Sequence, residues 1–121
     1  MENAKKFVIQ KHSRADDIHW DLMLQTGEML ETYRLELPPE KLLLMSSAAL
    51  KIFDHPLKFL TYEGSVNSGK GNVEIADSGT YQFLSEAENR KEMQISGEIL
   101  KGEFVLTRVK NDKWLFAPIS S

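Results

Sequence analysis

The stretch Ile18-His19-Trp20-Asp21-Leu22-Met23-Leu24 has the two-residue alternation of a β-strand with one apolar face. Its large apolar members share that face, whereas His19 and Asp21 point from the other one. Thr26-Gly27 then predicts a turn into a second strand over Met29–Leu37, which Pro38 ends because proline supplies no ladder donor. This region is therefore expected to form a β-hairpin.

Most of the remaining chain is typical of further short strands. We expect strands at Phe7–Gln10, Phe59–Tyr62, Asn72–Ala76, Thr80–Leu84, Glu92–Leu100, Phe104–Lys110 and Trp114–Phe116, with turns at Asp77-Ser78-Gly79 and Lys101-Gly102. The apolar spacing in Glu40–Ile52 instead favours a short or broken helix. About eight short strands joined by tight turns predict a mainly β fold, either a small antiparallel barrel or a sandwich, with one or two short helices.

Composition limits the kind of protein. The 121 residues, 41% of them hydrophobic, suffice for one domain over residues 1–121. The absence of cysteine excludes disulfides, thiolate metal sites and a cysteine nucleophile. Without a long apolar run or a signal peptide, we expect a cytoplasmic monomer that does not enter membranes. A net charge of −3 argues against a protein that holds nucleic acid by charge alone.

Two of the three histidines lie near one carboxylate in the sequence. His19 and Asp21 share one strand face, and His12 ends the preceding strand. Two imidazoles and a carboxylate are suitable ligands for a divalent ion such as Mn²⁺ or Zn²⁺. The alternative is a solvated sheet face with no ion. His55, in Asp54-His55-Pro56, is either a proton donor to a leaving oxygen or a turn residue bonded to local backbone.

Several blocks of sequence together resemble the 3′-phosphoesterase domain family of bacterial DNA ligase D. The matching blocks, in order, are Phe7–His12, Ile18–Leu22, Asp54–Leu57, Tyr62–Gly64, Gly71–Ile75, Asp77–Thr80, Gly97–Leu106 and Trp114-Leu115. They cover nearly the whole chain, and several blocks in order are more specific than any one of them.

The resemblance implies a small closed antiparallel β-barrel of about eight strands, a function, and a role for particular residues. Members of this family trim 3′ ends of DNA, removing a terminal ribonucleoside and then the phosphate, so that a ligase or polymerase partner can act. By resemblance, His12, His19 and Asp21 are the metal ligands in a central polar pocket, and manganese is the usual ion. Gln10 supports the first ligand, and His55 contacts the phosphate or protonates the leaving group.

The chain departs from the family pattern at four positions where polar side chains are expected, namely Met23, Leu37, Ser47 and Phe59. Three of these losses remove a cation, so the resemblance implies a weakened phosphate clamp. Candidate replacements are Arg34, Lys51 and Lys70. Three hypotheses remain open: a metal-dependent phosphoesterase, a degenerate module that binds metal or nucleic acid without turnover, and an unrelated β-barrel.

Overall fold

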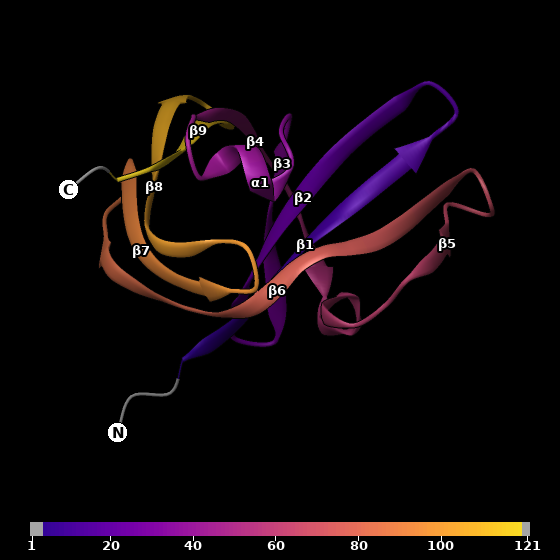
Figure 1. The fold of residues 1–121 in the computed structure, drawn as a ribbon, viewed down its shortest axis with the longest axis horizontal. Coiled ribbons are helices and arrows are strands. Elements are labelled where there is room, and N and C mark those ends of the chain that lie inside the picture. The colour runs from indigo at the N-terminus through magenta and orange to yellow at the C-terminus, as the bar shows by residue number, and fades with distance from the viewer. Residues whose placement is uncertain (1–3, 120–121) are drawn as a thin grey trace.

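A computed structural model describes residues 4–119, which are mostly β-strand (Figure 1). The strands are β1 (Lys5–Arg14), β2 (Asp17–Thr26), β3 (Met29–Leu35), β4 (Ser47–Pro56), β5 (Gly64–Val66), β6 (Gly71–Glu86), β7 (Arg90–Gly97), β8 (Lys101–Lys110) and β9 (Lys113–Pro118). Two single-turn helices accompany them: α1 (Pro39–Leu42) and the 3-10 helix η1 (Leu57–Leu60). No helix within residues 4–119 is long and apolar enough to cross a membrane.

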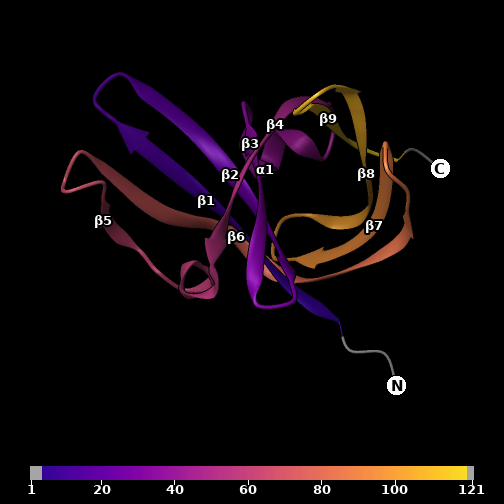
Figure 2. The same cartoon turned by 180° about the vertical axis from the view of Figure 1, so that it is seen from behind.

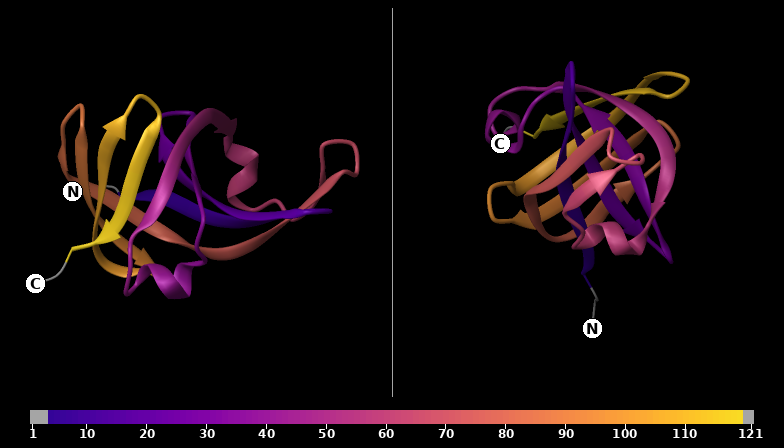
Figure 3. Two further views of the ribbon diagram at one scale, coloured as in Figure 1. Left: turned by 90° about the horizontal axis from the view of Figure 1, so that it is seen from above. Right: turned by 90° about the vertical axis from the view of Figure 1, so that its right-hand side faces the viewer.

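The strands form one antiparallel sheet that closes on itself. Its order is β1-β2-β3-β4-β9-β8-β7-β6-β5, and β1 also pairs with β6, so eight strands form a ring and β5 extends the outer edge of β6. The closed antiparallel barrel predicted from the sequence is therefore confirmed. Figures 2 and 3 show the β1–β2 hairpin and the β5–β6 pair extending together beyond the barrel.

Alternation along the strands divides the apolar residues between two faces. The main core lies on the face that includes Ile9, Leu22 and Tyr33. On the opposite face of the same strands, Val8, Met23 and Leu30 form a smaller cluster, against which Leu57, Phe59, Leu60 and Ile75 pack. The second cluster matters for function because the polar residues of β1 and β2 share its face.

The helix expected over Glu40–Ile52 is largely wrong. The α-helix ends at Leu42, and residues from Ser47 onward belong to β4, which pairs with β3 on one side and β9 on the other. Two-sided pairing satisfies the backbone of β4 and outweighs a weak helical spacing. The strand expected at Phe59–Tyr62 is also wrong, since this segment begins within the helix η1.

The turn expected at Asp77-Ser78-Gly79 is wrong as well, because β6 runs unbroken through it. A register shift opposite Ile9 and Gln10 gives β6 an extra residue there, which lets a strand accommodate an irregular sequence. The next predicted turn, at Lys101-Gly102, is displaced: both residues begin β8, and the connection from β7 occupies Glu98–Leu100.

The displaced turn is held by the Asp77 carboxylate. Its two oxygens accept backbone N–H groups from Ser78, Glu98, Ile99 and Leu100 at 2.8–3.1 Å. Asp77 is 3% exposed, so these bonds form out of contact with solvent. Asp77 lies in a stretch whose composition suggests a turn. Its side chain instead holds the turn at Glu98–Leu100, about twenty positions later.

Candidate metal and phosphate site

Strand pairing brings the predicted metal ligands together. In the β1–β2 hairpin, His12 lies directly opposite His19, and Gln10 lies opposite Asp21. One ligand atom from each of His12, His19 and Asp21 lies within 4.8 Å of the others. The His12 Nδ1–Asp21 Oδ2 distance is 3.7 Å, and the His19 Nε2–Asp21 Oδ1 distance is 3.4 Å. Three side chains thus offer donors to one point.

These side chains are buried, and several of their ligand atoms have no hydrogen-bond partner. The side chains of His12, His19 and Asp21 are 13%, 4% and 6% exposed. Among residues 4–119, His12 Nε2, His19 Nε2 and Asp21 Oδ1 are buried and lack a hydrogen bond. His12 faces Asp21 through Nδ1, and its Nε2 lies toward Gly71. Because leaving buried polar atoms unpaired is costly, a cation that completes His19 Nε2 and Asp21 Oδ1 fits this cluster. Imidazole and carboxylate suit zinc and manganese.

Asp17 orients the central histidine. Its Oδ2 lies 2.9 Å from His19 Nδ1, so Nδ1–H donates to Asp17 and Nε2 faces Asp21. A carboxylate behind a ligating imidazole is the arrangement that fixes ring orientation in metal sites. The Asp21 carboxylate 3.4 Å from Nε2, and secondarily the hydrogen bond to Asp17, raises the pKa of His19, whereas burial lowers the pKa of His12.

Strand β6 passes close to the His12 ring at Gly71. A methyl group at this glycine would lie 2.9 Å from His12 Nε2. The absence of a side chain therefore lets β6 pass beside the His12 ring. This is the structural use of the Gly71 that begins one of the family-like blocks.

Gln10 braces the segment that covers the site. It is 1% exposed, and its Nε2 donates to the carbonyl oxygens of Phe59 and Tyr62 at 3.0 and 2.9 Å. Both amide hydrogens are thus used to hold η1 and the residues after it against β1. Gln10 lies beside the metal ligands, and its contacts give it a positioning role.

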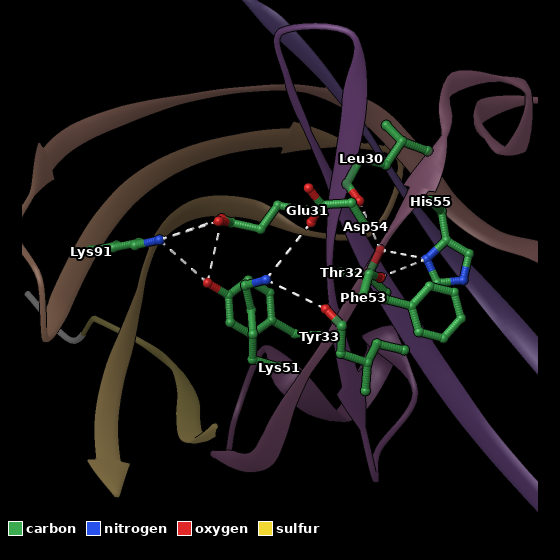
Figure 4. Close-up of polar contacts among 10 residues, drawn as sticks. Leu30, Glu31, Thr32, Tyr33, Lys51, Phe53, Asp54, His55 and Lys91 are labelled. Carbon is green, nitrogen blue, oxygen red and sulfur yellow. Dashed lines mark hydrogen bonds and ion pairs between the residues drawn. The ribbon is translucent and has the colours of Figure 1, made fainter. Parts of the chain in front are cut away.

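His55 lies in the same cavity as the cluster, and its ring nitrogen Nδ1 has two hydrogen-bond neighbours. Its Nδ1 lies 2.9 Å from Thr32 Oγ1 and 3.1 Å from the Phe53 carbonyl oxygen (Figure 4). The Thr32 hydroxyl donates its own proton to the carbonyl of Leu30. Both partners of Nδ1 are therefore acceptors, which places the proton on Nδ1 and directs Nε2 away from these two contacts.

The protonation of His55 follows from its surroundings. Burial lowers the pKa of the imidazole, and the negative charge of Asp21 opposes this effect. In the free protein at neutral pH, Nε2 therefore carries a lone pair. It can donate a hydrogen bond only after the ring gains a proton, which an incoming phosphate dianion would favour.

One cavity of about 360 Å³ joins these groups. It is lined by Gln10, His12, Arg14, His19, Asp21, Met23, Arg34, Ile52, Phe53, His55, Pro56, Phe59, Val66, Asn67 and Val73. The strands that line it keep their main apolar core on the opposite face. The site therefore lies outside the filled interior of the barrel, beneath the segment that contains η1 and β5.

Of the three candidate phosphate-binding cations, only Arg34 lines this cavity. It lies directly across from Asp21 on β3, and its buried Nε has no hydrogen-bond partner in the described part of the chain. Lys51 instead lies over the Tyr33 ring and 3.7 Å from Asp54 (Figure 4). Lys70 lines a neighbouring depression next to Arg14.

The four departures from the family pattern fall into two groups. Met23 and Phe59 line the cavity and belong to the second apolar cluster, so they give the site an apolar floor. Leu37 packs against the main core, and buried Ser47 accepts the N–H of Glu36. The latter two therefore support the fold.

Two functional candidates were missed by the sequence analysis, Asp17 and Arg14. Asp17 follows the same two-residue period that groups His19 with Asp21, so the alternation itself contained the signal. Arg14 lines the cavity from the end of β1, two positions after His12, and obeys the same rule. The first strand was predicted to end at Gln10 and the second to begin at Ile18, so Arg14 and Asp17 both lay outside the predicted strands.

The fold and the cavity together define a small β-barrel with a cluster of two histidines and one aspartate beside a third histidine. The sequence profile of the DNA ligase D 3′-phosphoesterase domain matches residues 10–108, so the chain belongs to that family. It is similar to the multifunctional non-homologous end joining DNA repair protein LigD of Mycobacterium tuberculosis, with 31% identity over 120 residues, 93% of this chain and 16% of the relative. The Pseudomonas aeruginosa multifunctional non-homologous end joining protein LigD is 26% identical over 121 residues, 90% of this chain and 14% of the relative. The chain therefore spans less than a fifth of the length of these relatives.

Proposed function

We propose that the protein is a metal-dependent phosphoesterase that acts on 3′ ends of DNA during end repair. Membership of the family supports a role in DNA end repair. The observation that carries the finer proposal is the convergence of His12, His19 and Asp21 with His55 and Arg34 on one cavity.

His12, His19 and Asp21 would hold the divalent ion. Manganese is our first choice and zinc the alternative. When bound, such an ion supplies Lewis-acid polarisation of phosphoryl oxygens. Asp17 accepts a hydrogen bond from His19 Nδ1–H and so keeps the proton on Nδ1, which leaves Nε2 available for the ion. Because the ligands must be deprotonated, ion binding would displace the proton that Asp21 and Asp17 favour on His19.

Arginines would bind the phosphate. Arg34 lies opposite Asp21 on the neighbouring strand, and Arg14, at the end of β1, also lines the cavity. Their guanidinium groups can each form paired hydrogen bonds with phosphate oxygens. They would replace the cations missing at Met23, Leu37 and Ser47. His55, once protonated, would donate from Nε2 to a phosphate or leaving oxygen.

The second candidate function is binding without turnover at the same cavity. The observation that favours it is the apolar floor made by Met23 and Phe59. Losing one well-placed charged donor from such a site costs about 2.7–4 kcal/mol of transition-state stabilisation, so two uncompensated losses would stop turnover. The two candidate functions differ in whether Arg34 and Arg14 replace the missing cations well enough for turnover.

The test is a primer assay. Wild-type protein, Mn²⁺ and a DNA primer with either a terminal ribonucleotide or a 3′-phosphate are expected to yield a shorter or dephosphorylated product. His19→Ala should abolish the reaction, and Arg34→Gln should lower kcat/KM by about 100-fold. Lys51→Gln is the matched control because Lys51 lies away from the cavity. Manganese-dependent DNA binding without product would favour the second candidate.

The proposal extends to a ligase or polymerase partner. The similar proteins are called multifunctional, and this chain spans 16% of the Mycobacterium tuberculosis protein. We propose that a repaired 3′ hydroxyl passes to such an activity. A monomeric state and a cytoplasmic location remain predictions.

A further inference from the structure

Phe53 is unusual among the aromatic residues of this protein. The chain has six Phe, two Trp and three Tyr, all within residues 4–119, and the other ten are buried or half-buried. Phe53 is 74% exposed. Single exposed apolar residues are common, so exposure alone carries no function. Phe53, however, also lines the cavity of the candidate site, where an exposed ring can contact a ligand.

One face of the Phe53 ring is fixed by His55. The two ring centroids lie 4.7 Å apart with an interplanar angle of 15°, a stacked arrangement visible in Figure 4. Phe59 supports His55 from another side, with centroids 5.6 Å apart and an angle of 84°. All three rings line the cavity that contains the metal cluster. The high exposure of Phe53 leaves its ring accessible to another flat group.

The cavity has two chemically different walls. The metal-ligand side carries His12, His19 and Asp21, with Arg14 and Arg34 nearby. The lining supplied by β4 and η1 is apolar and aromatic, and includes Ile52, Phe53, Pro56 and Phe59. A phosphate alone needs only the first wall, whereas a nucleotide has an anionic part and a flat apolar part that match both.

We propose that Phe53 is a stacking platform for the nucleobase at the 3′ end of the substrate strand, an inference that rests on the proposed function. Bases of single-stranded ends can leave their neighbours and stack on aromatic side chains, a contact that tolerates any base. The net charge of −3 strengthens the argument, because a protein with little electrostatic attraction for DNA needs affinity from contacts other than charge.

The test compares two oligonucleotides with single-stranded 3′-phosphate ends. One ends in 2-aminopurine, whose fluorescence is quenched on stacking, and the other ends in an abasic sugar. Binding is measured in EDTA, where metal-dependent turnover stops, for wild type, Phe53→Leu and Phe53→Trp. Leu44→Ala is the matched control, since Leu44 is 88% exposed outside the cavity.

Wild type is expected to quench the 2-aminopurine and to bind this end about tenfold more tightly than the abasic end. Phe53→Leu should lose both the quenching and the preference, whereas Phe53→Trp and Leu44→Ala should retain them. Equal loss for both ends in Phe53→Leu would overturn the inference, since it would mean that Phe53 acts only by holding His55. So would unchanged quenching, or no binding of either end by wild type.

Failure of this inference can be separated from failure of the proposed function. If Mn²⁺-dependent removal of the phosphate had equal kcat/KM for the 2-aminopurine end and the abasic end, the base contact would be rejected. The proposed phosphoesterase activity would then still be supported. Base-dependent binding that needs Phe53, without any turnover in Mn²⁺, would keep the base contact and support a binding module instead.

Discussion

At the residue scale, a two-residue period accounts for most of the candidate site. It predicted that His19 and Asp21 share a face, and the structure adds Asp17 by the same rule. The pairing of His12 with His19 follows from the tight turn between Arg14 and Asp17. The turn at Gly27-Glu28, one residue after the predicted start, likewise places Arg34 across from Asp21. Which residues lie opposite one another could thus be predicted from the sequence only if the exact turn positions were known.

The first prediction concerns Asp17. Asp17→Asn removes the negative charge that holds His19 Nδ1–H, and its amide can turn a donor toward Nδ1 and favour the wrong tautomer. We expect metal affinity to fall about 10- to 100-fold, as is typical when the carboxylate behind a metal-binding histidine is lost. The fold should be unaffected because the Asp17 side chain is 47% exposed. Calorimetric titration with Mn²⁺ or Zn²⁺ measures the affinity.

Asp16→Asn is the control for this prediction, because it removes a neighbouring exposed carboxylate that makes no contact with His19 among the described hydrogen bonds. A general loss of surface charge would weaken metal binding equally in both variants. Equal affinities for Asp17→Asn and wild type would show that His19 needs no such orientation.

At the element scale, local composition was a poorer guide than at the residue scale. Asp77-Ser78-Gly79 has the composition of a turn, yet all three residues pair with β1 as part of β6, and Gly79 also pairs with β7. Glu40–Ile52 likewise looked helical, but β4 takes its partners from β3 and β9. Both errors arose because strand pairing is set by distant segments, which no local window can contain.

The second prediction tests the buried carboxylate that organises the β7–β8 turn. Asp77→Ala would leave the N–H groups of Glu98, Ile99 and Leu100 without their acceptor. Buried donors left unpaired cost about 1–3 kcal/mol each, so we expect the free energy of unfolding to fall by about 3 kcal/mol or more. Urea denaturation measures it.

Asp77→Asn should be less harmful than Asp77→Ala, since its amide keeps one oxygen that can accept. Asp16→Ala, at an exposed turn, controls for the removal of a carboxylate and should stay within about 0.5 kcal/mol of wild type. If Asp77→Ala unfolded at the same urea concentration as wild type, the turn would not depend on this residue.

At the scale of the whole molecule, the two faces of the sheet separate stability from chemistry. The main core fills the barrel, and the metal cluster and its cavity lie on the opposite face. The number of short strands left a barrel and a sandwich open, and the family resemblance favoured the closed barrel. The strand order was not predictable, because the β4–β9 and β1–β6 pairings that close the ring join segments far apart in the chain. Substitutions in the cluster should therefore affect ion binding while leaving the core intact.

The third prediction follows from this separation. An ion that binds only the folded protein stabilises it by RT ln(1 + [L]/Kd), about 2.7 kcal/mol at a free concentration 100 times Kd. We expect Mn²⁺ or Zn²⁺ to raise the melting temperature of the wild type. Ca²⁺ should raise it less, since it prefers oxygen ligands and the cluster offers two imidazoles. The shift should vanish in His19→Ala and persist in His55→Gln, because His55 lies outside the cluster. A wild type that responds to neither ion, or a shift of equal size in His19→Ala, would show that the three donors do not form a metal site.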